Sequence, residues 1–60
     1  MEVIFEFKQI GQIVKVTAID CQTGMEATIQ GPASAGKVLL QQNAAAKLAY
    51  LIRKETGVGS

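Results

Sequence analysis

Apolar and polar residues alternate along three segments of the first half of the chain, over residues 2–10, 12–20 and 25–30. Such period-two alternation is typical of strands that bury one face and leave the other in water. We therefore predict a three-stranded antiparallel meander with one continuous apolar face. The residues of that face are Val3, Phe5, Phe7, Val14, Val16, Ala18, Ala27 and Ile29.

The first turn sets the register between the first two strands. A two-residue turn at 10–11 would place Phe7 opposite Val14 and Glu6 opposite Lys15. Apolar residues then meet on one face and opposite charges meet on the other, and both kinds of cross-strand pair stabilise a sheet. We expect this register because a slip of one residue would destroy both matches.

The second turn is longer and lies between the second and third strands. A four-residue loop, 21–24, would use Gly24 in a left-handed conformation that glycine adopts without steric cost. Asp20 then pairs with Met25, and Ala18 lies opposite Ala27. This register keeps the apolar face continuous across all three strands.

The alternation ends at Gly31-Pro32, and residues 34–56 are rich in Ala, Leu, Gln and Lys, as a helix prefers. Ser34 is a plausible N-cap, and Gly57 suits the position that follows the last helical residue. We therefore predict one α+β domain over residues 1–60, a three-stranded antiparallel meander followed by one long C-terminal helix packed on one face (βββα).

Apolar residues surround this predicted helix on more sides than one small sheet can cover. One apolar face of the predicted helix holds Val38, Ala45, Leu48, Ala49 and Ile52, and Leu40, Ala44 and Leu51 widen this face on one side. The candidate interface residues are Leu39, Leu40, Ala44, Ala46, Tyr50 and Leu51. A helix that is apolar on more than one face is buried by further protein, which for so short a chain indicates a homo-oligomer, with a dimer favoured. The helix surface or a sheet edge would form the interface, and an unidentified protein is the alternative partner.

Length and composition support the same interpretation. The chain has 60 residues, near the lower limit for a domain that folds without help. It contains one cysteine and no histidine, so neither an internal disulfide nor a typical structural zinc site is expected. A partner chain is the remaining common source of stability. We expect a cytoplasmic location, because the chain shows no secretory signal or membrane-span pattern and its thiol has no partner.

The segment GPASAGKV, residues 31–38, resembles the phosphate-binding loop G-x-x-x-x-G-K-[ST] in all but its last position. Val38 stands where the loop needs a hydroxyl that binds Mg²⁺. An antiparallel meander also lacks the parallel sheet in which that loop occurs. We therefore interpret the segment as the end of a strand and the start of a helix, with Lys37 in solvent.

Residues that carry catalysis are sparse. Cys21 has no histidine to act as its general base, and its position in a turn gives no reason for an activated thiolate. The five carboxylates show no spacing that pairs them for acid and base chemistry. We expect no enzymatic activity, no cofactor and no bound metal.

Nucleic-acid binding is the alternative function. Three strands followed by a helix that contains NAAAKLAYLI resemble the later part of a double-stranded-RNA-binding domain, and this resemblance implies contacts to phosphates. The candidate contacts are Lys37, Lys47, Arg53 and Lys54. The chain lacks that family's lysine cluster and first helix, and its net charge is only +1, so nucleic acid is an unlikely partner.

A second resemblance covers most of the chain. The run EVIFEFKQIGQIVKVTAIDCQTGMEATIQGPASAG and the later KLAYLI are similar to a family of very short uncharacterised bacterial proteins that consist of this unit alone. The resemblance implies a stand-alone protein with the βββα fold. It implies no activity and no site residues.

Overall fold

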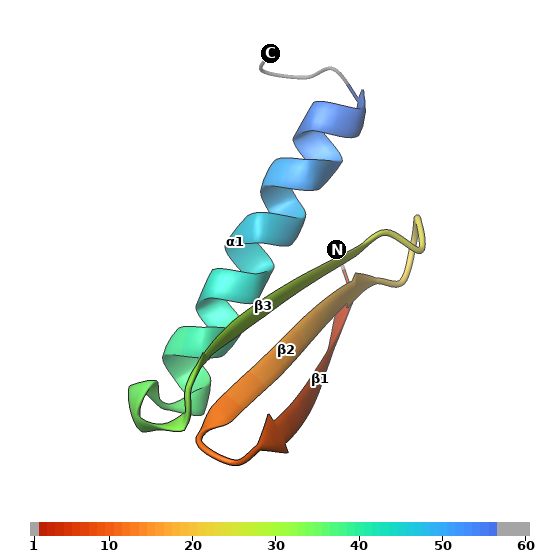
Figure 1. Ribbon diagram of the computed structural model, residues 1–60. Helices are drawn as coiled ribbons and strands as arrows, with labels where there is room; N and C mark the ends of the chain where they lie inside the picture. The colour runs from red at the N-terminus through yellow and green to blue at the C-terminus, as the bar shows by residue number, and fades with distance from the viewer. Residues whose placement is uncertain (1, 57–60) are drawn as a thin grey trace.

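Three antiparallel strands and one long helix make up the computed structural model of the chain, which describes residues 2–56. The elements, in order, are β1 (Val3–Ile10), β2 (Ile13–Asp20), β3 (Glu26–Pro32), the 3₁₀ turn η1 (Ala33–Ala35) and α1 (Lys37–Thr56). The strands form one sheet in the order β1-β2-β3, and α1 lies across one face of it (Figure 1). The predicted α+β arrangement, βββα, is confirmed. The helix ends at Thr56, as predicted, and the capping position predicted for Gly57 lies outside the described residues.

The register between β2 and β3 is the predicted one. Ala18 pairs with Ala27, and the N–H of Asp20 donates to the carbonyl oxygen of Met25 at 2.9 Å. Gly24 has a φ of 79°, in the left-handed region, so it closes the loop as expected.

The predicted register between β1 and β2 is wrong by two residues. Phe7 pairs with Val16 rather than Val14, and Glu6 pairs with Thr17 rather than Lys15. The turn residues are Gly11 and Gln12, not Ile10 and Gly11, because a two-residue hairpin needs a positive φ that a β-branched residue resists.

Glycine at the first turn position supplies that angle. Gly11 has a φ of 61°, and the following Gln12 does not have a positive φ, which is the pattern of a type II′ turn. A shift of two residues leaves every side chain on its original face, because strand side chains alternate with a period of two. The residues predicted on the apolar face are therefore the same in both registers.

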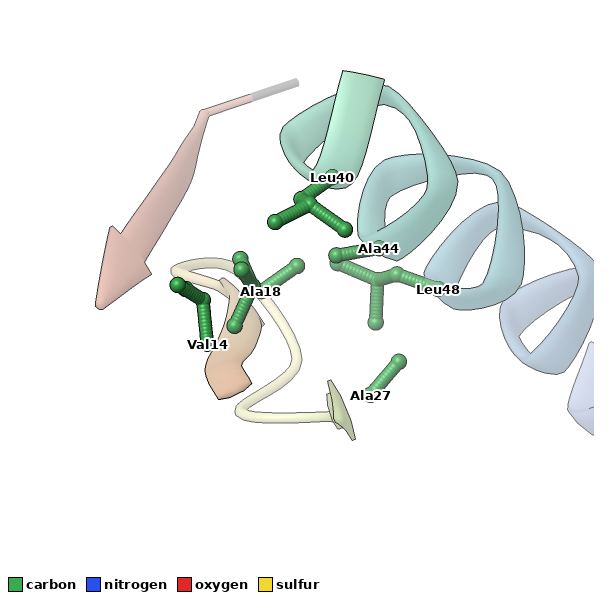
Figure 2. Close-up of a cluster of buried hydrophobic side chains, with 7 residues drawn as sticks. Val14, Ala18, Ala27, Leu40, Ala44 and Leu48 are labelled. Atoms are coloured by element: carbon green, nitrogen blue, oxygen red, sulfur yellow. The ribbon is translucent and has the colours of Figure 1, made fainter. Parts of the chain in front are cut away.

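The core lies between α1 and the inner face of the sheet (Figure 2). Its buried apolar residues are Val14, Val16, Ala18, Ala27, Leu40, Ala44 and Leu48. Leu48 and Val16 are the largest side chains that are fully buried, and burial of a side chain of this size stabilises a fold by about 1.5–3 kcal/mol. The core is thin, because three of its seven members are alanines.

The buried face of α1 differs from the predicted one. Leu40, Ala44 and Leu48 follow a spacing of four residues and point toward the sheet (Figure 2). Leu48 was expected there, whereas Val38 is 71% exposed. Ile52 packs against the edge of the core, as predicted. The buried face of α1 is therefore rotated about the helix axis, toward Leu40 and Ala44, relative to the apolar face predicted from the sequence.

The junction between β3 and α1 corrects the predicted helix start. β3 continues through Gly31 and Pro32, and Ser34 lies in η1, so it is not the N-cap of α1. The helix begins at Lys37, after Gly36, whose φ is 88° and whose carbonyl oxygen accepts a hydrogen bond from Leu40 N at 3.2 Å. The phosphate-loop resemblance therefore covers a strand end, a 3₁₀ turn and a helix start.

Candidate interaction surface

The free edge of β3 is partly covered. The ammonium group of Lys47, on α1, donates a 2.8 Å hydrogen bond to the carbonyl oxygen of Thr28. Pro32, at the end of the same strand, has no N–H to offer. An occupied carbonyl, a lysine and a proline are the means by which proteins prevent an edge strand from pairing with another chain.

The free edge of β1 has no such cover among residues 2–56. The carbonyl oxygen of Glu2 accepts a hydrogen bond from Cys21 N at 3.0 Å, which shows that the even-numbered residues here direct their backbone groups toward β2. Backbone direction alternates along a strand. Val3, Phe5, Phe7 and Gln9 therefore direct their N–H and C=O groups outward.

The helix lies away from this edge. α1 packs chiefly on β2 and β3. Figure 1 shows β1 as the edge strand that lies farther from α1. The inner face of β1 is thus at the margin of the core. Val3 and Phe5 are half-buried, and Phe7 is 37% exposed.

Lys37 covers part of the Phe7 ring. Its ammonium nitrogen lies 5.6 Å from the ring centroid, within the range of a cation–π interaction. Lys37 comes from the first turn of α1, so this contact joins the start of the helix to the outermost strand. Phe7 is still 37% exposed, so an aromatic side chain contacts water beside the free edge of β1.

The outer face of β1 combines apolar ends with a charged centre. Ile4 is 51% exposed and Ile10 is 64% exposed, and Glu6 and Lys8 lie between them on the same face. Each isoleucine has an isoleucine of β2 opposite it, Ile19 and Ile13 respectively. No described residue covers the exposed Ile4, Ile10 and Ile13.

The predicted helix interface separates into two groups. Leu40 and Ala44 are 3% and 0% exposed, so both side chains belong to the core of the single chain. Leu51 is half-buried and packs against the same core. The other three candidates, Leu39, Ala46 and Tyr50, are exposed. Their spacing of seven and four residues places them along one strip of α1, on the side away from the sheet.

The four basic candidates are not brought together. Lys37 lies over Phe7 at the start of α1, whereas Lys47 is bonded to the backbone of β3. Arg53 and Lys54 belong to the last turn of the helix. A helix of 20 residues is about 30 Å long, so these side chains are distributed along it rather than collected in one patch.

The β2–β3 loop is held by a carboxylate that sequence reasoning treated only as the end of a strand. Asp20 is 2% exposed and accepts hydrogen bonds from the Thr23 hydroxyl at 2.7 Å and from Gln22 N at 3.2 Å. The Thr23 hydrogen bond lowers the pKa of Asp20 below its usual value, and the backbone N–H groups of Gln22 and Thr23 act in the same direction against the opposing effect of burial. An Asp followed three residues later by Thr, within a turn, was the signal that could have identified this motif.

Other chemistry is limited in the part of the chain that the structure describes. Cys21 is exposed in the β2–β3 loop. No three Cys, Asp or Glu side chains among residues 2–56 are arranged to hold a metal ion. Within the same residues, no helix combines the length and the apolar character that crossing a membrane requires.

Comparisons with known proteins are consistent with the resemblance to a family of short proteins. A search of curated proteins and a search of solved structures each gave no match. A family model described as "Domain of unknown function (DUF6898)" matches residues 1–55, which include all three strands and nearly all of α1. The chain therefore belongs to the DUF6898 family.

Proposed function

We propose that the protein is a small non-enzymatic interaction module that self-associates as a homodimer. The observation that carries this proposal is the uncovered edge of β1, which is eight residues long and bordered by the exposed side chains of Ile4, Phe7 and Ile10. A long strand edge with apolar neighbours is a template for pairing with another chain. The contrast with the partly covered edge of β3 supports β1 as the interacting edge.

The size of the core supports the same proposal. Among residues 2–56, seven apolar side chains of small or medium size are buried, and they stabilise a chain of 60 residues. Single cores of this size supply only about 3–5 kcal/mol, and small domains commonly gain the rest from association. A dimer would bury apolar area that now faces water, and each buried Å² of such area contributes about 25 cal/mol.

Light scattering on a sizing column tests the proposal. We expect the main species at micromolar concentration to have twice the 6.4 kDa mass of the chain, and dilution to shift it toward the monomer. A well-folded monomer throughout the micromolar range would contradict self-association.

The cytoplasm is the location that we propose for this module. Cys21 is exposed and lies in a loop, and an exposed thiol stays reduced in the cytoplasm. Fractionation of cells that contain the tagged protein tests this location. Recovery of the protein outside the cytoplasmic fraction would contradict it.

A further inference from the structure

We infer that β1 pairs antiparallel with β1 of a second copy, about a two-fold axis that passes between their Phe7 residues. This inference rests on the proposed self-association and specifies its geometry. It joins two three-stranded sheets into one sheet of six strands. The residues that decide the register are Ile4, Glu6, Lys8 and Ile10, all on the outer face.

The direction of the backbone groups limits the possible registers. Only Val3, Phe5, Phe7 and Gln9 direct N–H and C=O groups to the free edge, as the Glu2–Cys21 hydrogen bond indicates. In an antiparallel pair, residues that exchange hydrogen bonds lie directly opposite each other. Odd-numbered residues must therefore face odd-numbered residues, so the two-fold axis passes through a residue position. The four such positions nearest the centre of β1 are 5, 6, 7 and 8.

The axis at Phe7 matches the outer face in both charge and hydrophobicity. Glu6 then lies opposite Lys8 of the second copy, and symmetry produces this ion pair twice. Ile4 lies opposite Ile10 of the second copy, also twice. Both isoleucines are more than half exposed in the single chain, so each would gain an apolar neighbour.

The three other axes lose these matches. An axis at Lys8 sets this ammonium group against its own copy and places Glu6 against Ile10. An axis at Glu6 sets this carboxylate against its own copy and places Ile4 against Lys8. An axis at Phe5 places Ile4 against Glu6. Like charges directly opposite each other destabilise a strand pair, and an apolar side chain gains little from a charged neighbour.

The inner face agrees with the axis at Phe7. The Phe7 Cα atoms of the two copies would be about 5.5 Å apart, as in any hydrogen-bonded antiparallel pair. The two rings would then cover each other on the side that the core leaves exposed. Phe5 would lie opposite Gln9, whose side chain now bonds the carbonyl oxygen of Gly11 at the adjacent turn.

Charge reversal on the outer face tests this register. Glu6→Lys and Lys8→Glu each place like charges opposite each other twice, so each variant is expected to raise the dimer dissociation constant at least tenfold. The double variant Glu6→Lys/Lys8→Glu restores opposite charges and is expected to return it to within about threefold of the wild type. Analytical ultracentrifugation measures these constants at low salt, where charge effects are largest.

Glu26→Lys is the matched control. Glu26 lies on the same outer face but belongs to β3. Its replacement by lysine changes the net charge by the same amount as Glu6→Lys. We expect its dissociation constant to equal that of the wild type. Circular dichroism establishes that each variant keeps the fold.

Hydrogen exchange gives a second measurement that needs no variant. The amides of Phe5, Phe7 and Gln9 point to the free edge and should become protected as the wild-type concentration rises through the dissociation constant. A dimer in which these amides exchange freely would overturn β1 pairing. The register would be overturned if the single charge reversals left the dimer intact, or if the double variant did not restore it. A monomeric wild type would overturn self-association itself.

Discussion

At the scale of single residues, Gly31 is needed for packing, although its sequence neighbourhood resembles a turn. It lies in β3, and a Cβ atom added to it would lie 2.5 Å from Cδ2 of Leu40. Leu40 is buried in the core, so its side chain has little freedom to move aside. The glycine therefore provides the space in which the first buried residue of α1 packs.

Gly31→Ala is expected to destabilise the fold by about 1–3 kcal/mol, the usual cost of overpacking. Urea denaturation measures the change in the free energy of unfolding. In a Leu40→Ala background the contacting atom is missing, and the same substitution should then cost little. Equal losses in the two backgrounds would show that Leu40 is not the cause.

Asp20 makes stability dependent on pH. Its pKa is lower in the folded chain than the value of about 3.9 in an unfolded one, so the charged carboxylate stabilises the fold. This stabilisation is complete above the unfolded pKa and is lost as the pH falls through the folded pKa.

Asp20→Asn should therefore lose less stability than the wild type when the pH is lowered from about 6 to about 2. Thr23→Val removes the hydroxyl that donates to the carboxylate and should have a similar effect on the pH dependence. Urea denaturation at both pH values gives the comparison. Identical acid sensitivity in the wild type and the Asn variant would refute this role of Asp20.

At the scale of elements, alternation predicted the three strands and their inner face, because it reports directly which side chains are buried. The longer loop was also predictable, since Gly24 is the one residue there that accepts a left-handed conformation at no cost. The β1–β2 register was missed by two residues because both registers bury the same side chains. The match of Glu6 with Lys15 favoured the wrong register, and the φ requirement at Gly11 favours the observed one.

The orientation of α1 was harder to predict, because apolar residues surround the helix and several faces compete. Ala44 is fully buried, and substitution by Leu should destabilise the fold by about 1–3 kcal/mol through overpacking. Val38→Ala, on the exposed side, should change stability by less than about 0.5 kcal/mol. Thermal or urea denaturation of the two variants tests the orientation, and a larger loss for the valine would contradict it.

At the scale of the whole molecule, the order of elements could be predicted from the sequence. The place of the uncovered surface could not. Whether α1 lies over β1 or over β3 depends on three-dimensional packing that strand alternation does not record. The sequence pattern therefore did not separate the buried Leu40 and Ala44 from the exposed candidates of the same helix.

The unequal protection of the two sheet edges also decides whether assembly can stop. If only one edge of each sheet pairs with another chain, the assembly is complete at two copies. If both edges could pair, each added chain would present a new free edge and a fibre would grow. Lys47 and Pro32 would then act as terminators of polymerisation. Lys47→Ala combined with Pro32→Val should yield large species that sediment on centrifugation, whereas Lys54→Ala, which removes the same charge at the helix end, should not.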